Sequence, residues 1–415
     1  MTRAPYELTL ISILFLAAGI LSVSLYRGAF APAPLLAVFA LGCFWLLIQA
    51  ALAKTAPAVD RLLLPLTCFL TAIGLVFIFR LKPALFWPQL AWAALGVCAF
   101  GAVVLKRRRL GQLYRYKYSI GLLGIVLLLV TLLFGVDIGG NKNWLALGSF
   151  RVQPSEFSRL CIIIFISGYL SSRHIELGQS LTRIGPLQLP HFRFLAPLLA
   201  VWGLAMLMLV VQRDLGAALL YFGSALILTC LASGRWAIAA LGSLFFACGS
   251  AVAYHLFPHV RTRIDIWLTP WADPDGSAYQ LLQSLFALGS GGVFGSGLAA
   301  GHPELIPEVH TDFIFSAIGE ELGFAGVACI LMLYLLLLYR CFGIALRSRT
   351  VFAGLTGAGL SLLLCLQIFI ILAGTTNLLP MTGITLPFIS YGGSSLLSSF
   401  ILAGIVASFS AEAIQ

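Results

Sequence analysis

The chain of 415 residues is 60% hydrophobic and only 10% charged, with a mean hydropathy of +1.01. Soluble globular domains carry about 25% charged residues, so this composition excludes a soluble protein and indicates an all-α protein that crosses a membrane many times. The net charge of +10 comes from Lys and Arg residues in short connectors between apolar segments, a pattern that indicates membrane topology and no nucleic-acid partner.

Apolar segments long enough to cross a bilayer recur along the whole chain. A transmembrane helix needs about 20 predominantly apolar residues. We therefore predict about twelve transmembrane helices, of which the first two, within residues 1–57, form an accessory pair beside a ten-helix core at 58–415. The predicted spans are residues 7–26, 33–53, 62–80, 86–105, 118–135, 155–171, 193–211, 214–232, 236–257, 312–339, 351–373 and 389–411.

The distribution of Lys and Arg residues predicts the orientation of these helices. The connector KRRRLGQLYRYK, residues 106–117, is strongly basic, and most other basic residues fall in connectors on the same side. By the positive-inside rule, that side and both termini are cytoplasmic, and anionic membrane lipid attracts it. The large polar loop 258–310, between the ninth and tenth helices, is then outside the cell.

The stretch from Arg261 to Gly323 holds more than half of the acidic residues of the chain. Within it, WADPDGSAYQ places Asp273 before a proline and near Trp267 and Trp271. A carboxylate that aromatic rings shield from water has a raised pKa and can act as a general base. Asp273 is therefore the candidate catalytic residue.

Other residues of the same stretch are candidates for substrate binding. The basic residues Arg261 and Arg263 lie at its start, and His310 and Asp312 lie near its end. His310 beside Asp312 suggests a dyad or a metal site, but the spacing of the histidines does not match a known zinc motif. The run LGSGGVFGSG lacks the preceding strand and following Lys-Ser/Thr of a nucleotide-binding loop.

A second polar cluster is GGNKNWLALGSFRVQPSEFSRL, residues 139–160, which includes Lys142 and Trp144. Glu156 and Arg159 are three residues apart, so a helix places them on one face within pairing distance. Charged residues in a membrane helix usually pair and often mark a function. The sequence leaves open whether this pair binds substrate or only neutralises itself.

Two further polar segments interrupt the apolar spans. In QRDLGAA, Asp214 follows Arg213 and either caps the next helix or contributes to a site. In TTNLLPMTGITLPFISYGGSS, the segment around Ser390, Gly392 and Gly393 is either a broken re-entrant segment that binds phosphate oxygens or a simple turn.

Seven segments in order give the chain a resemblance to the SEDS family (shape, elongation, division and sporulation), which contains FtsW, RodA and SpoVE. They are FWPQLAWAALG, NKNWLALG, QPSEFSRL, DLGAA, WADPDGSAYQLLQSLFALGSGG, PEVHTDFIFSAIGEELG and TGITLPFISYGGSS, spread over residues 60–411. Three features depart from the family pattern: Arg159 stands where lysine is usual, Arg213 stands where proline is frequent, and the N-terminal helix pair is extra.

The resemblance implies a ten-helix glycosyltransferase that polymerises lipid II into β-1,4-linked glycan by inversion, together with a class B penicillin-binding protein. The family's essential aspartate matches Asp273, and the glutamate of its QPSE motif matches Glu156. A lipid-linked pyrophosphate donor is already activated, so we expect no nucleotide or redox cofactor. Cations then stabilise the departing pyrophosphate, either from the side chains Arg159, Lys142, Arg261 or Arg263 or from Mg²⁺ or Mn²⁺ held by outer carboxylates.

Two other functions are compatible with these features. A lipid II flippase would use the charged pair Glu156 and Arg159 along a polar path through the membrane. A scaffold for a penicillin-binding protein would need no acidic outer loop. Glycan synthesis by the purified protein in detergent distinguishes an enzyme from both, because detergent removes the barrier that a flippase works across.

Overall fold

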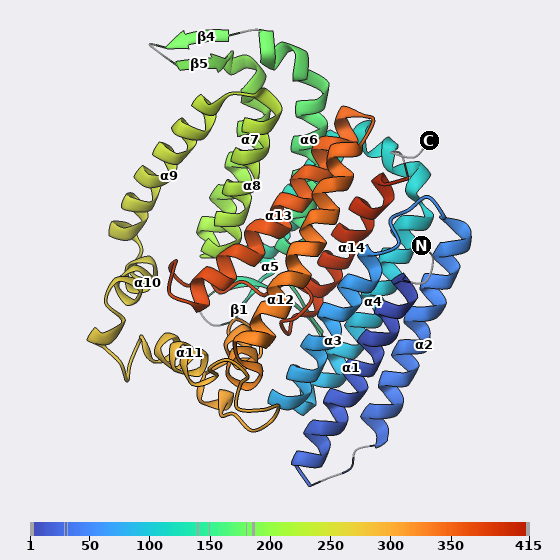
Figure 1. The fold of residues 1–415 in the computed structure, drawn as a ribbon. Coiled ribbons are helices and arrows are strands. Elements are labelled where there is room, and N and C mark those ends of the chain that lie inside the picture. The colour runs from blue at the N-terminus through green and yellow to red at the C-terminus, as the bar shows by residue number, and fades with distance from the viewer. Residues whose placement is uncertain are drawn as a thin grey trace. The chain divides into compact units, whose positions relative to one another are not determined.

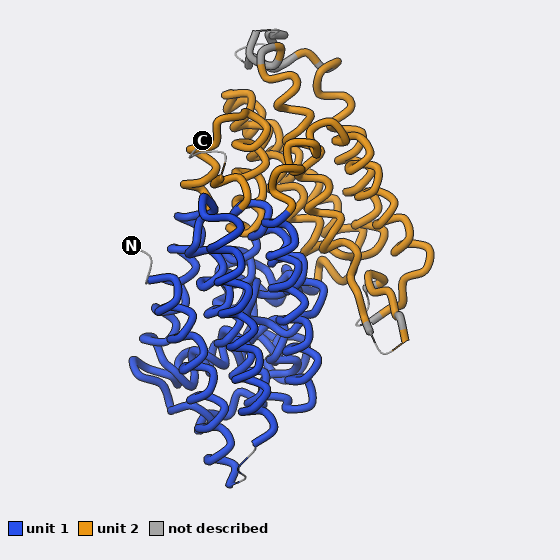
Figure 2. The backbone as a smooth tube through the Cα atoms, turned by 90° about the vertical axis from the view of Figure 1, so that its right-hand side faces the viewer, with its two compact units in different colours: residues 1–105, 262–340, 367–407 blue, residues 106–261, 341–366, 408–415 orange. Residues whose placement is uncertain are grey.

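The computed structural model describes residues 4–28, 30, 32–138, 141–148, 150–179, 181–184 and 187–411. The chain divides into two compact units, each built from separate parts of the sequence (Figure 2). Unit 1 consists of Met1–Leu105, Thr262–Arg340 and Gln367–Ala407, and unit 2 of Lys106–Arg261, Cys341–Leu366 and Ser408–Gln415.

A helix lies at each of the twelve predicted spans (Figure 1). Among the described residues, ten helices are long and apolar enough to cross a membrane, which confirms an all-α polytopic membrane protein. The apolar helix α14 has 17 residues, so the count of twelve crossings stays a prediction. The helices are α1 (Ala4–Tyr26), α2 (Pro32–Thr55), α3 (Leu63–Leu81), α4 (Phe86–Leu105), α5 (Lys117–Phe134), α6 (Ser155–Gln179), α7 (Phe192–Val211), α8 (Leu215–Ser233), α9 (Trp236–Leu256), α12 (Ile314–Arg347), α13 (Val351–Thr375) and α14 (Gly393–Phe409).

Helix α3 forms the core of unit 1, because it is apolar around its whole circumference and buried along almost its full length. Small residues let its neighbours approach closely. A Cβ atom at Gly74 would lie 2.3 Å from the carbonyl oxygen of Ile389, and one at Gly19 of α1 would lie 2.6 Å from Val76. Helix α3 therefore contacts both α1 and the segment before α14.

The stretch 258–310, predicted as one large polar loop, contains short helices. They are α10 (Pro258–Leu268), α11 (Tyr279–Ser290) and the 3₁₀ turns η3 (Pro270–Ala272) and η4 (Pro303–Leu305); two more such turns, η1 (Pro83–Leu85) and η2 (Arg107–Tyr114), lie elsewhere. Helix α11 buries one face through Leu281, Leu282 and Ala287. Residues 262–310 are therefore an ordered part of unit 1 rather than an extended loop.

Unit 2 contains two small antiparallel sheets that the sequence analysis did not predict. The first has the order β1 (Val136–Ile138), β2 (Asn141–Leu147) and β3 (Phe150–Val152), with Val136 opposite Trp144 and Leu145 opposite Val152. The second is the hairpin of β4 (Leu181–Ile184) and β5 (Leu187–Pro190). The strands are only three to seven residues long, so the alternation of apolar and polar residues along them is too short to predict a strand from the sequence.

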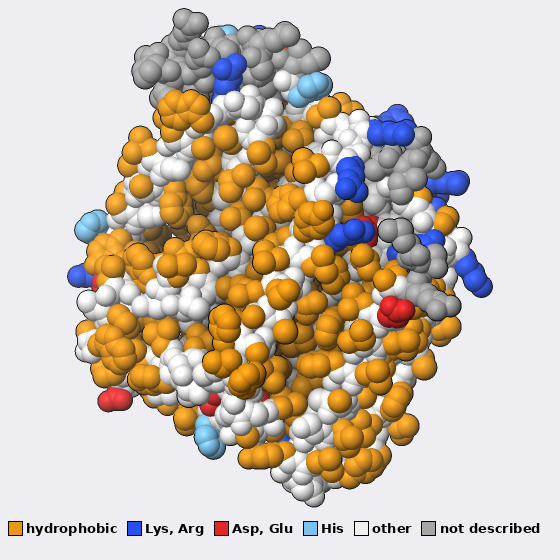
Figure 3. All heavy atoms as spheres, viewed as in Figure 1, with side chains coloured by type: hydrophobic (Ala, Val, Ile, Leu, Met, Phe, Trp, Pro, Cys, Tyr) orange, Lys and Arg blue, Asp and Glu red, His pale blue; other side chains and the backbone are white. Residues whose placement is uncertain are grey.

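Large apolar side chains are exposed along the long helices. Leu122, Leu207 and Leu335 are 61 to 66% exposed, and hydrophobic side chains cover most of the face in Figure 3. A soluble protein rarely exposes contiguous apolar surface on this scale. The exposed surface therefore agrees with helices that contact lipid.

Candidate active site

Asp273 lies in the exposed loop that joins α10 to α11. Its Oδ2 accepts hydrogen bonds from the backbone N of Ser277 at 2.7 Å and from Ser277 Oγ at 2.9 Å. Gly276 permits this turn, because a Cβ atom there would lie 2.3 Å from Asp273 Oδ2. The sequence DPDGS therefore folds back on itself and fixes the carboxylate.

The pKa of Asp273 is lowered, so the prediction of a raised pKa is wrong. The hydrogen bonds from Ser277 are the cause, because they stabilise the ionised carboxylate. The tryptophans of the loop leave Asp273 exposed to water: Trp271 is itself 65% exposed, and the indole N–H of Trp267 donates to the carbonyl of Asn377 at 3.2 Å. Asp273 is therefore an ionised carboxylate at neutral pH.

A cavity of about 190 Å³ within unit 1 adjoins this loop. Ser277, which binds Asp273, forms part of its wall. Arg263 from α10 and Asp312 from the turn before α12 supply charged side chains to the same wall. The structure thus brings three of the predicted site residues, Asp273, Arg263 and Asp312, into one region.

Arg263 and Asp312 approach the same backbone position, Gly383. A Cβ atom there would lie 3.6 Å from Arg263 Nη2 and 3.7 Å from Asp312 Oδ2, and Arg263 Nη1 donates to the carbonyl of Met381 at 3.0 Å. Burial raises the pKa of Asp312 to about 6, while the positive charge of Arg263 opposes the increase. The cavity therefore holds a permanent cation and a carboxyl group that titrates near neutral pH.

His310, two residues before Asp312, is buried and does not line this cavity. Its Nε2 lies 3.5 Å from Glu308 Oε2, and its ring packs against Tyr391 with centroids 5.7 Å apart. Burial lowers the pKa of His310, and the charge of Lys82 lowers it further. His310 is therefore mainly neutral at neutral pH and contacts protein groups.

The polar groups of Ser390 and Gly392 form hydrogen bonds with other groups of the protein. Ser390 Oγ donates to the carbonyl of Thr311 at 2.5 Å and accepts from Leu386 N at 2.9 Å. The N–H of Gly392 donates to Gln89 Oε1 at 3.3 Å. These contacts fasten the segment before α14 to Thr311, next to the cavity, and to Gln89 of α4.

Gly393, at the start of α14, is required by packing. A Cβ atom there would lie 2.2 Å from the indole nitrogen of Trp92. The predicted role of Ser390, Gly392 and Gly393 in phosphate binding stays a prediction, while their role in packing is visible.

Glu156 and Arg159 form an ion pair within unit 2, as their spacing on one helix predicted. Both side chains are at least nine-tenths buried. A buried pair is costly to break, because removal of one partner leaves an uncompensated charge. The pair is a structural element of α6, and its contact with substrate stays a prediction.

Asp214 caps α8, as one of its two predicted roles required. Its Oδ1 accepts from Ala217 N at 3.0 Å, which satisfies a free N–H of the first helical turn. Its Oδ2 accepts from Asn143 Nδ2 at 2.9 Å and from Gln153 Nε2 at 3.1 Å. This buried carboxylate therefore joins α8, β2 and the segment before α6.

The remaining candidates also lie in unit 2. Lys142 is exposed on β2, where its backbone N donates to the carbonyl of Gln212 at 3.3 Å, and Trp144 is half-buried on the same strand. Arg213 adopts a positive φ of 61° in the turn before α8. Arg261 lies over the ring of Tyr254 at 5.7 Å. None of these residues lines the cavity beside Asp273.

The divalent cation predicted from the outer carboxylates has no matching donor set among the residues that the structure describes. In that part of the chain, no group of three or more His, Cys, Asp or Glu residues could hold a metal ion. We assign no step to a metal.

Three residues of this region were not predicted from the sequence. Ser277 holds Asp273, Asn377 binds Trp267, and Arg80 contacts Glu321 of α12 and the carbonyl of Gly301. For Ser277 and Asn377, nothing in the sequence beyond their polar side chains indicates a role in the site. Arg80 is an arginine at the end of an otherwise apolar helix, and this position could have marked it as a charge with a buried partner.

The comparisons with known proteins agree with the fold and with the motifs. The model of the FtsW, RodA and SpoVE family, described as cell cycle protein, matches residues 60–415. Peptidoglycan glycosyltransferase RodA of Mycobacterium tuberculosis is 42% identical over 373 residues, which cover 87% of this chain and 80% of that protein.

Two solved structures are similar along most of the chain. One describes structural coordination of polymerization and crosslinking by a peptidoglycan synthase complex; it matches with a TM-score of 0.73 and 27% identity over 86% of this chain and 99% of that chain. The crystal structure of the rod shape determining protein RodA of Thermus thermophilus matches with a TM-score of 0.61 and 26% identity over 86% of this chain and 98% of that chain.

The raised pKa of Asp312 predicts a pH-dependent effect of Asp312→Asn on stability. Between pH 3.8 and about pH 6, Asp312 keeps its proton in the folded state but loses it in the unfolded state. The free energy of unfolding therefore falls by about 3 kcal/mol as the pH rises through that interval. The variant should therefore have a higher Tm than the wild type at pH 7 and an equal Tm at pH 4. If the variant differed from the wild type in Tm by the same amount at pH 4 and pH 7, the raised pKa of Asp312 would be contradicted. Asp275→Asn, at an exposed carboxylate, serves as the control.

The contacts of Asp214 predict different effects for two substitutions. Asp214→Ala removes the cap and the acceptor of the buried Asn143 amide, which should cost about 2 to 4 kcal/mol. Asp214→Asn keeps an oxygen for the cap and should cost less. Thermal unfolding in detergent measures both, and a smaller loss for the alanine variant would refute the capping role.

Proposed function

Because the chain belongs to the FtsW, RodA and SpoVE family of peptidoglycan glycosyltransferases, we propose that it polymerises lipid II, with Asp273 as the general base. One observation carries the choice of base: the ionised, exposed carboxylate of Asp273 is held by Ser277 beside a cavity that also contains Arg263. The expected product is β-1,4-linked glycan for cell shape, elongation, division or sporulation.

The chain is a multi-pass membrane protein, and we propose that both termini are cytoplasmic. The basic connector 106–117 supports this orientation through the positive-inside rule. Asp273 then lies at the outer face, where a cell wall is built. The partner that we propose is a class B penicillin-binding protein, which the match to a peptidoglycan synthase complex supports.

In the proposed reaction, the 4-hydroxyl oxygen of the acceptor sugar attacks the anomeric carbon of the donor. The bond from that carbon to the pyrophosphate oxygen breaks, the pyrophosphate leaves with the electron pair, and the hydroxyl proton passes to Asp273. A single displacement inverts the α-linked donor to a β linkage. A carboxylate of lowered pKa is a weak base, so the proton is transferred late, when the attacking oxygen has become acidic.

Arg263 is the cation that we assign to the departing pyrophosphate. It lines the same cavity as Ser277, and its guanidinium is oriented by the Met381 carbonyl. Arginine recognises phosphate oxygens through two parallel N–H groups, and a fixed cation stabilises developing negative charge without reorganisation. Asp312 opposes excess positive charge in the cavity before substrate arrives.

A second cavity of unit 1, an apolar groove of about 500 Å³, is suited to an isoprenoid tail. Its lining is almost wholly apolar and comes from α11, α12 and α13, with Phe324 and Phe369 among the exposed side chains. The segment 376–378 lies between the two cavities, because Thr376 and Leu378 line the apolar one and Asn377 lines the polar one. If the pyrophosphate of the lipid lies at Arg263, the tail of the same lipid would therefore reach the apolar groove.

Asp273→Asn tests the base directly. The amide cannot accept the proton, so we expect kcat for glycan synthesis by the purified protein in detergent to fall by about 10² to 10⁴ while lipid II binding persists. Asp275→Asn, two residues away and exposed, should leave the rate unchanged. A normal rate for Asp273→Asn would rule out the general base, and no glycan from the wild type with its partner would favour a flippase or scaffold.

Thr376→Trp tests the apolar groove. Thr376 is exposed and bonds only to carbonyls of its own helix, so the larger ring should fill the groove without disturbing the core. We expect a several-fold higher KM for lipid II with a full-length tail and no change for an analogue with a short tail. Leu335→Trp, on an exposed face outside the groove, is the control. An equal change with both tail lengths would contradict tail binding.

A further inference from the structure

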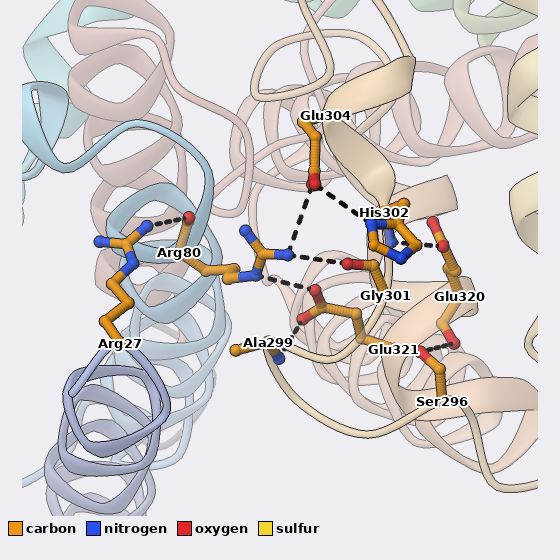
Figure 4. A network of polar contacts seen from close by, with 9 residues as sticks. All are labelled: Arg27, Arg80, Ser296, Ala299, Gly301, His302, Glu304, Glu320 and Glu321. Atoms are coloured by element: carbon orange, nitrogen blue, oxygen red, sulfur yellow. Dashed lines mark hydrogen bonds and ion pairs between the residues drawn. The ribbon is translucent and has the colours of Figure 1, made fainter.

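Arg80, near the C-terminal end of α3, binds one group of α12 and two groups of the segment 299–304 (Figure 4). Its Nε donates to Glu321 Oε1 at 3.0 Å, and its Nη2 donates to the carbonyl of Gly301 at 2.9 Å and lies 3.4 Å from Glu304 Oε2. The Arg80 side chain is 13% exposed, and that of Glu321 is fully buried. The pair is therefore shielded from water and firmly oriented.

The two adjacent carboxylates of α12 hold the backbone of the same segment. Glu321 Oε2 accepts from Ala299 N at 3.0 Å, and Glu320 Oε1 accepts from His302 N at 2.7 Å. Ala299 adopts a positive φ of 71°, an unfavourable conformation that these contacts maintain. Segment 299–302 is thus fixed at both ends by carboxylates, one of which depends on Arg80.

The accessory helix α1 supports Arg80 from the other side. Arg27, just beyond the end of α1, donates from Nη2 to the carbonyl of Arg80 at 2.6 Å, and its guanidinium lies 5.7 Å from the ring centroid of Phe79. Helix α1 packs along α3, where Phe15 meets Phe69 edge-on at 5.7 Å. The helix pair therefore contacts α3 at Arg80, the residue that holds the segment 299–304.

The segment leads directly to the polar cavity. Beyond η4, Glu308 lies 3.6 Å from Lys82 and 3.5 Å from His310, and the next residues carry Asp312 into the cavity wall. A displacement of the backbone at 299–304 would be transmitted along these few residues. Misplacement of a reacting group by about 1 Å can reduce a rate about 100-fold.

We propose that Arg80 is a positioning residue for glycosyl transfer and that the N-terminal helix pair acts in the reaction by holding Arg80 through Arg27. The inference rests on the proposed function for its activity readout. It assigns a role to the part of the chain that precedes the family match at residue 60. Arg80 touches no reacting atom in this role; it fixes the segment that carries the cavity wall.

The experiment compares three variants of the full-length protein by Tm, kcat, KM and hydrogen exchange of the Ala299 and His302 amides. Arg80→Met leaves the buried Glu321 without its partner, so Tm should fall, exchange should rise and kcat should drop at least about tenfold with little change in KM. Arg80→Met combined with Glu321→Leu removes both charges, so Tm should recover in part. It also removes the acceptor of Ala299 N, so exchange should stay high and kcat low. Arg27→Met should raise exchange and lower kcat several-fold at an unchanged Tm.

The matched control is the ion pair of Arg340 and Asp60, which are 2.6 Å apart in the same unit. Arg340→Met should lower Tm without changing exchange at 299–302 or kcat. Recovery of both Tm and kcat in the double variant would show that the Arg80 pair is only structural and would overturn the proposal. Wild-type exchange and kcat in Arg27→Met would overturn the role of the helix pair, and absence of glycan synthesis by the wild type would instead refute the proposed function.

Discussion

The break in α12 at Gly323 is the constraint on which the segment 291–302 of unit 1 depends. Gly323 has a φ of 64° and a ψ of −168°, which interrupts the helical hydrogen bonds in a segment otherwise apolar enough for a membrane. The carbonyls of Glu320 and Glu321 accept from Ser296 and Gly297, at 2.9 and 3.0 Å. Because unpaired backbone groups cost several kcal/mol in lipid, the glycine-rich segment must fill the break.

This requirement explains the glycines that resembled a nucleotide-binding loop. A Cβ atom at Gly295 would lie 2.2 Å from the carbonyl oxygen of Glu321, and one at Gly291 would lie 2.0 Å from that of Gly319. Only glycine allows the two backbones to approach so closely. The run LGSGGVFGSG therefore serves helix packing, and the carboxylates at the break are placed where Arg80 and the segment 299–302 can use them.

Local patterns in the sequence predicted the features that depend on neighbouring residues. The length of apolar runs located the helices, and the spacing of Glu156 and Arg159 predicted that they could pair. A helix cap was one of the two roles predicted for Asp214. Features that join distant residues were not predictable in this way. Arg80 and Glu321 are 241 residues apart, and nothing near either residue in the sequence identifies the other.

The wrong prediction for Asp273 shows how two local effects compete. Nearby tryptophans suggested desolvation, which raises a carboxyl pKa, but Ser277 supplies two donors four residues later. Direct hydrogen bonds dominate, because the exposed carboxylate keeps most of its hydration in the folded protein and pays little desolvation cost. The more buried Asp312 shows the opposite balance, with its pKa raised to about 6. Two carboxyl groups in one region thus differ in pKa, because Asp273 is solvated and hydrogen-bonded while Asp312 is desolvated.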